Sequence, residues 1–103
     1  MTHYRSKPVV IEAMQFVRGA VFPAWLTDAR LAGKVKVHME IPGGDYMLID
    51  TLEGQMRANE NDWIIKGLED EIYPCKPSVF AAKYEEYDEE LETRRAMIEG
   101  VHE

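Results

Sequence analysis

An alternating run from Lys34 to Ile41 constrains the fold of this chain more than any other feature. Its apolar members stand at every second position, at Val35, Val37, Met39 and Ile41. Because successive side chains of a strand point to opposite faces, this run predicts a strand with one buried and one solvated face. The turn-forming residues at 42–45 (Pro-Gly-Gly-Asp) end it, which favours pairing with the strand that follows.

The segments on either side predict the remaining elements. Pro8–Val17 is rich in β-branched and aromatic residues and apolar on both sides, which indicates a central strand. A helix follows, beginning near Pro23 and ending at Gly33. Its buried face is predicted to carry Phe22, Trp25, Leu26 and Ala29. Further strands are predicted at 46–52, 55–58, 63–66 and 71–75.

Together these elements predict an α+β fold. The expected architecture is an antiparallel sheet curled around the first helix, or a small, partly open barrel of about five or six strands. The strand at 71–75 belongs at an edge, because Pro74 cannot donate a hydrogen bond to a neighbour. Ser78 is a suitable N-cap for a C-terminal helix. Residues 1–84 are expected to form a single domain.

Residues 85–103 differ in charge from the rest of the chain. They hold 8 Asp or Glu and 2 Arg, whereas residues 1–84 hold 11 Asp or Glu and 10 Lys or Arg. We predict an acidic amphipathic helix from Tyr84 onward, which docks on its own domain or joins two copies. The residues predicted to mediate self-association are Tyr84, Tyr87, Leu91 and Ile98. A homodimer is the favoured assembly, because a small domain has few apolar faces to spare.

Composition excludes several classes of function. The near-neutral body disfavours direct nucleic-acid binding, which needs many cations to neutralise phosphates. No run of about 18 apolar residues is present to span a membrane. The single cysteine cannot form an internal disulfide, so a reducing cytoplasm is the expected location.

Three segments carry a resemblance to a known family. They are Tyr4–Ala13 (YRSKPVVIEA), Thr51–Gly54 with Met56 and Ala58, and Asp62–Gly67 (DWIIKG) leading to Tyr73–Pro77 (YPCKP) with Phe80 and Tyr84. The chain thereby resembles a family of small uncharacterised phage and prophage proteins. Residues 42–46 (PGGDY) also resemble the Pro-Gly-Asp-Tyr-Gly motif of one such group, with an additional Gly and no Gly after Tyr46. The resemblance implies a shared fold and the cytoplasm of an infected bacterium, and it carries no established activity.

Few residues could support catalysis or bind a metal. Cys75 lies next to Lys76, and a nearby cation would favour its thiolate. The alternative interpretation is a small, half-buried residue at a strand end. His3, His38 and His102 are scattered, so neither a nucleophile–base pair nor metal-ligand spacing is apparent. We therefore expect no enzymatic activity, no metal and no cofactor.

Cations and aromatic residues instead concentrate in the segments that resemble the phage family. The predicted ligand-binding set is Arg5, Lys7, Trp63, Lys66, Tyr73 and Lys76. If the first strand lies beside the strands of Trp63 and Tyr73, these residues would line one positive surface. Such a surface suits a small phosphorylated host molecule, with the cations on phosphate and a ring stacked on a base. The alternative is that both aromatic residues are core.

Two functions from different classes follow. The first is a non-enzymatic phage accessory protein that sequesters a small phosphorylated host molecule, as counter-defence proteins do. The second is a protein-binding module that inhibits or redirects a host factor through a sheet edge or the acidic tail. An acidic tail that mimics nucleic acid is a third, less favoured interpretation.

Overall fold

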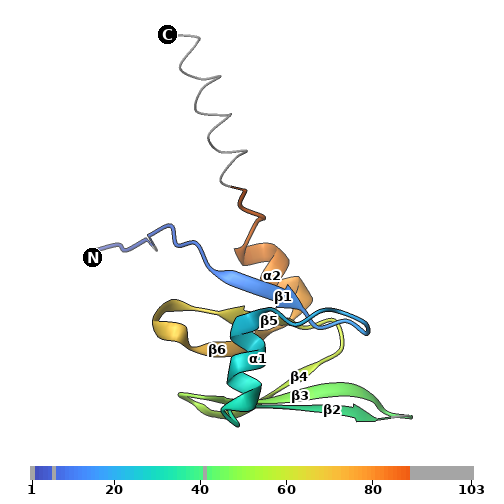
Figure 1. The fold of residues 1–103 in the computed structure, drawn as a ribbon. Helices are drawn as coiled ribbons and strands as arrows, with labels where there is room; N and C mark the ends of the chain where they lie inside the picture. Colours follow the sequence, from blue (N-terminus) through green and yellow to red (C-terminus); the bar gives the residue numbers. More distant parts are fainter. Residues whose placement is uncertain (1, 6, 41, 89–103) are drawn as a thin grey trace.

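Six strands form two separate antiparallel sheets in the computed structural model, which describes residues 2–5, 7–40 and 42–88 (Figure 1). One sheet has the order β1-β5-β6 and contains β1 (Glu12–Gln15), β5 (Trp63–Lys66) and β6 (Ile72–Cys75). The other has the order β2-β3-β4 and contains β2 (Val35–Glu40), β3 (Gly44–Thr51) and β4 (Gly54–Asn59). The α+β class is confirmed. A continuous curled sheet or a closed barrel is not, because within the described residues the ladders stay inside each three-stranded sheet.

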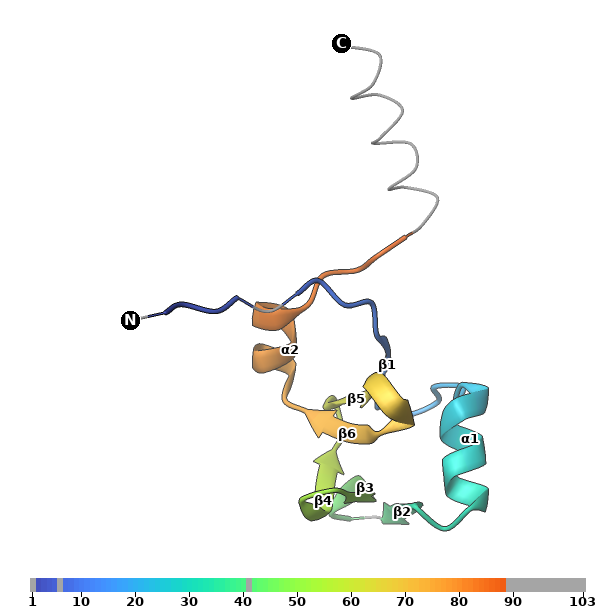
Figure 2. The ribbon, with the colours of Figure 1, turned by 90° about the vertical axis from the view of Figure 1, so that its left-hand side faces the viewer.

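Among the described residues, two α-helices and a short 3-10 helix accompany the two sheets. Helix α1 (Ala24–Leu31) runs from one sheet to the other and closes one side between them (Figures 1 and 2). Pro23 precedes it in an extended conformation. At its end, Gly33 has φ +82°, and the Gly33 and Lys34 N–H groups donate to the Arg30 and Ala29 carbonyls. This pair of bonds satisfies two otherwise free carbonyls, and the left-handed position favours glycine.

The main core lies between the two sheets and under α1. Its buried members are Phe16, Leu26, Ala29, Val35, Met47, Ile49, Ala58 and Ile64. The helix face expected from the sequence is confirmed, because Leu26 and Ala29 are buried and Phe22 and Trp25 pack against the cluster. The alternation of β2 is confirmed only in part. Val35 is buried, whereas Met39 is 63% exposed, because the far half of the β2–β3 hairpin projects beyond the other sheet (Figure 1).

A second apolar layer covers the outer face of the β1-β5-β6 sheet. Register places Trp63 opposite Cys75 and Ile65 opposite Tyr73, so all four side chains share this face. Helix α2 (Pro77–Lys83) lies over it, with the Phe80 ring stacked on Trp63 at a centroid distance of 3.9 Å. Ile65 is fully buried without belonging to the main core. The sheet therefore has apolar residues packed on both of its faces.

The structure contradicts three sequence-based predictions about individual elements. The first strand spans only Glu12–Gln15 and forms a sheet edge rather than a centre, because β5 is its one neighbour among the described strands. Helix α2 begins at Pro77, with Lys76 rather than Ser78 at the N-cap, because proline already has a helical φ and needs no N–H at the first position. Tyr84 is extended, with φ −127° and ψ 150°, and residues 84–88 contain no helix.

The structure also bears on the membrane prediction. Within the described part of the chain, no helix is long and apolar enough to cross a bilayer.

Candidate binding cleft

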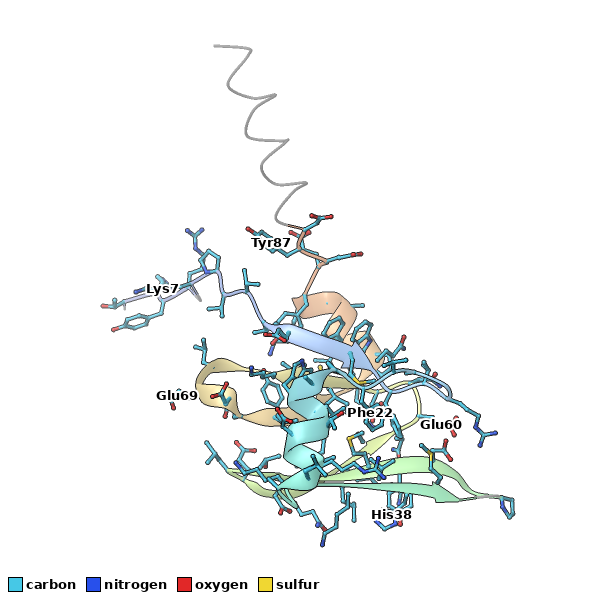
Figure 3. The ribbon with its side chains drawn as sticks, in the orientation of Figure 1. Lys7, Phe22, His38, Glu60, Glu69 and Tyr87 are labelled. Atoms are coloured by element: carbon cyan, nitrogen blue, oxygen red, sulfur yellow. The ribbon has the colours of Figure 1, made fainter. Side chains whose placement is uncertain are left out.

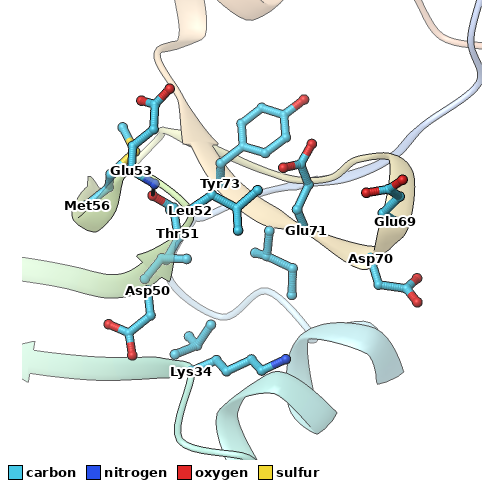
Figure 4. Close-up of a pocket in the computed structure, with 13 residues that line it drawn as sticks. Lys34, Asp50, Thr51, Leu52, Glu53, Met56, Glu69, Asp70, Glu71 and Tyr73 are labelled. Carbon is cyan, nitrogen blue, oxygen red and sulfur yellow. Dashed lines mark hydrogen bonds between the residues drawn. The ribbon is translucent and has the colours of Figure 1, made fainter.

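A cleft of about 640 Å³ opens where the β3–β4 turn faces the loop before β6 (Figure 4). The 3-10 helix η1 (Leu68–Asp70) forms part of that loop. The cleft is lined by Lys34, Val35, Ile49, Asp50, Thr51, Leu52, Glu53, Met56, Glu69, Asp70, Glu71, Ile72 and Tyr73. Val35 and Ile49 also belong to the main core, and Ile72 packs against it, so the floor of the cleft is apolar.

The charged residues that line the cleft are mainly acidic. Five carboxylates and a single ammonium, that of Lys34, line it. In Figure 4 the Glu53 and Glu71 carboxylates lie on the two sides of the cleft, whereas Asp50 points away from its centre. The Leu52 side chain lies between the two sides, and it is 90% exposed. The cleft therefore combines a strongly negative rim with apolar surface, which favours cationic groups.

The acidic loop on one side of the cleft has a strained backbone. Glu69 and Asp70 have φ values of 59° and 61°, in the left-handed region that side chains rarely adopt. Each such residue costs on the order of 1 kcal/mol. Lys66 Nζ lies 3.5 Å from Asp70 Oδ1, and the Gly67 N–H donates to the Glu71 carbonyl at 2.9 Å. The ion pair and the hydrogen bond both lie in the loop that carries Glu69, Asp70 and Glu71 to the side of the cleft.

Tyr73 lines the upper side of the cleft, and its side chain lies on the outer face of the β1-β5-β6 sheet. Burial raises the pKa of Tyr73 to about 12, and its hydrogen bond to Tyr84 and the Glu71 carboxylate add to the effect. The ring passes so close to Gly67 that a Cβ there would lie 3.0 Å from Tyr73 Cε1. Tyr73 is therefore a neutral hydrogen-bonding group at physiological pH.

The raised pKa of Tyr73 predicts a late step in an alkaline titration. Tyrosinate absorbance should show one phenol that ionises near pH 12 rather than near pH 10. Because the folded state favours the neutral phenol, its contribution to stability is complete below pH 10 and is lost as the pH rises toward 12. Tyr73→Phe should remove the late step. Tyr4→Phe, at a ring that is 93% exposed, should leave the late step in place. A late step that persists in Tyr73→Phe would contradict the assignment.

The structure does not bring the six predicted ligand-binding residues onto one surface. Only Tyr73 lines the cleft. Lys66 lies on the face of the sheet opposite to Trp63 and Tyr73, because its position differs from theirs in register parity. Arg5 and Lys7 are exposed on the extended N-terminal segment, where Figure 3 shows Lys7.

Trp63 and Lys76 already have partners. The Trp63 ring is stacked on Phe80 with an interplanar angle of 4°. Lys76 Nζ lies 3.3 Å from Oδ2 of Asp62, a buried carboxylate that also accepts the Asn59 N–H at 2.9 Å. In this structure Trp63 therefore joins α2 to the sheet, and Lys76 neutralises a buried carboxylate.

The predicted self-association residues are only partly within the described chain. Tyr84 lies against Phe80, with ring centroids 5.1 Å apart, so it packs on its own domain. Tyr87 is 54% exposed. Leu91 and Ile98 lie outside the described residues.

A different cation–aromatic cluster lies on the outer face of the β2-β3-β4 sheet. The His38 ring stacks on Tyr46 at 4.7 Å, and the Arg57 guanidinium lies 4.0 Å from the centre of the same ring. Figure 3 shows His38 pointing away from the core. Because β2 and β4 flank β3, the two neighbours cover opposite faces of Tyr46. Its ring is therefore not free to stack on a base.

Metal and thiol chemistry find little support in the described residues. They contain no group of three or more His, Cys, Asp or Glu side chains placed to hold a metal ion. Cys75 ends β6 half-buried, with Sγ 3.7 Å from the Lys76 carbonyl oxygen. This environment agrees with the interpretation of Cys75 as a small, half-buried residue at a strand end.

Sequence reasoning missed the residues that form the cleft. Glu69 and Asp70 could be assigned only to a polar turn and Glu53 only to a hairpin connection, whereas Leu52 and Glu71 were assigned to the ends of strands. Both turns carry acids, which was the one available signal. Their proximity depends on how the two sheets pack. A comparison of the chain with protein-family models, curated proteins and solved structures finds no match.

Proposed function

We propose that this protein works by binding, and that its cleft holds a lysine or arginine side chain of a partner protein. The observation that carries the proposal is the cleft itself, which has the Glu53 and Glu71 carboxylates on its two sides and an apolar floor, with five acidic residues and one lysine in its lining. A long basic side chain has an aliphatic stem that prefers apolar contact and a cationic head that prefers carboxylates. The partner is then a protein with an exposed basic segment.

This proposal develops the protein-binding alternative, with the cleft in place of a sheet edge or the acidic tail. A phosphorylated molecule is less favoured, because a phosphate would meet the negative rim of the cleft. In the phage context implied by the sequence resemblance, the partner would be a host factor and the site of action the bacterial cytoplasm.

The test is a titration of the full chain with a capped hexapeptide that contains two arginines, followed by calorimetry or amide chemical shifts. We expect a dissociation constant of about 0.1–1 mM, as for one buried stem and a few exposed ion pairs. Binding should weaken as salt rises, because the charges are partly exposed. Pyrophosphate and AMP serve as parallel probes for the phosphorylated-ligand alternative.

Charge reversal locates the site. The double variant Glu53→Lys, Glu71→Lys should weaken peptide binding by tenfold or more, because two attractive contacts become repulsive. The matched control is Glu85→Lys, Glu86→Lys, which changes net charge equally at two exposed acids outside the cleft. Equal loss in both variants would favour the acidic tail over the cleft. Binding of pyrophosphate or AMP without binding of the peptide would replace this proposal with the phosphorylated ligand.

A further inference from the structure

Strand β1 has a free hydrogen-bonding edge. The Phe16 N–H donates to the Asp62 carbonyl at 2.8 Å, and the Phe16 carbonyl accepts the Asn61 N–H at 2.7 Å. Backbone groups of an antiparallel strand alternate in direction, so the even-numbered residues of β1 face β5. The N–H and C=O groups of Ala13, and of Ile11 and Val9 if the extended chain continues the alternation, therefore face outward. Within the described residues no strand pairs with them.

The segment that leads into β1 is apolar and exposed. Val9 is 48% and Val10 67% exposed, and Ile11 completes a run of three β-branched residues. Extended chain with this composition on both faces is typical of a strand that has neighbours on both sides. If the alternation continues to Pro8, its nitrogen faces the β5 side and leaves the outer edge unblocked.

The other sheet edges carry features that discourage pairing. Strand β6 contains Pro74, β2 carries Lys36, and β4 carries Arg57. Proline and charged side chains are the usual means by which edge strands avoid association. From residue 8 to 15, β1 and its approach carry only Glu12 as a charged residue. The β1 edge is thus the least protected of the four.

We infer that residues 7–15 pair antiparallel with the same residues of a second copy, which joins two β1-β5-β6 sheets into one sheet of six strands. In a two-fold contact, the backbone groups of one β1 edge form hydrogen bonds with the same edge of the second copy. The apolar run of each copy then packs beside the apolar run of its partner. The segment contains one cation, Lys7, and one carboxylate, Glu12, so two copies do not repel each other.

Symmetry and the free edge together select a register. The two-fold axis requires that paired residues have the same hydrogen-bonding direction, and the outward residues are odd-numbered. The described segment that leads into β1 begins at Lys7 and is not itself a strand, so the ladder requires residues 7–11 to align with β1 when the copies pair. At the other end, Gln15 precedes a turn in which its carbonyl accepts the Val17 N–H. The longest symmetric ladder between these limits pairs Ile11 with Ile11 of the second copy, Val9 with Ala13, and Lys7 with Gln15.

Disulfide trapping tests this register in the full chain. In a Cys75→Ser background, Ile11→Cys should give a covalent dimer under mild oxidation, because directly paired Cα atoms lie about 5.5 Å apart. The control is Leu31→Cys, on α1, at a side chain that is 83% exposed. Failure of Ile11→Cys to form a dimer, or equal crosslinking of both variants, overturns the inference.

A proline substitution tests the hydrogen bonds without a crosslink. Ile11→Pro removes an outward N–H and leaves the β1–β5 ladder intact, so the dissociation constant of the dimer should rise by tenfold or more in analytical ultracentrifugation. The melting temperature measured at dilute, monomeric concentration should not change. A wild-type chain that is monomeric at millimolar concentration, or an Ile11→Pro variant that dimerises as before, overturns the inference. None of the cleft-lining residues lies in 7–15, so this dimer and the binding of a basic side chain can fail independently.

Discussion

Replacing Trp63 with alanine is expected to lower the free energy of unfolding by about 3 kcal/mol. The change removes the ring that stacks on Phe80 and opens the layer between α2 and the outer face of the β1-β5-β6 sheet. The expected loss is at the lower end for a large aromatic residue, because Trp63 is only half-buried. Chemical denaturation followed by circular dichroism measures it.

A double-mutant cycle separates the stack from the burial. Phe80→Ala and the Trp63→Ala, Phe80→Ala double variant should give a coupling energy of about 0.5–1.5 kcal/mol, the usual value for a well-formed aromatic pair. A Trp63→Ala protein of unchanged stability would contradict the packing role. It would return Trp63 to the ligand-binding role suggested by its cationic neighbours in sequence.

Replacing Phe16 with alanine is expected to cost about 3–5 kcal/mol, the largest effect of any single truncation proposed for this chain. Phe16 is 2% exposed and meets Phe22 edge to face, with ring centroids 6.4 Å apart. Its backbone groups also join β1 to the turn at Asn61 and Asp62. Those bonds remain in the variant, so the loss reports the cavity and the removed apolar contacts.

A surface truncation provides the reference for Phe16. Leu31→Ala shortens a side chain that is 83% exposed, and it should change the free energy of unfolding by no more than about 0.5 kcal/mol. The midpoints of urea unfolding compare the stability of the two variants directly when the dependence of the unfolding free energy on urea concentration is the same in both. If Phe16→Ala were no more costly than Leu31→Ala, Phe16 would not be a central member of the core.

The sequence predicted local elements better than their assembly. Alternation in β2, the helix stop at Gly33 and the edge position of β6 at Pro74 each follow from one residue type in one backbone conformation. Pro8–Val17 was predicted to be central because it is apolar on both sides. Its position at an edge depends on which strands pair with it, and no local pattern contains that information.

The candidate site was harder to predict for the same reason. Lys66 and Trp63 are close in sequence, yet an odd spacing along one strand separates them to opposite faces. Glu53 and Glu71 are 18 positions apart and line one cleft, because the two sheets meet there. Proximity in sequence favoured the cationic set, whereas tertiary packing brought together the acidic one.

The layer formed by α2 has a consequence for the order in which the molecule opens. Phe80 and Tyr84 reach only the outer face of the β1-β5-β6 sheet, and the main core lies on its other face. Helix α2 can therefore detach without exposing Phe16, Ile64 or the buried face of α1. Such a local opening costs less free energy than complete unfolding. We therefore expect the amide hydrogens of α2 to exchange before those of β3 and β5.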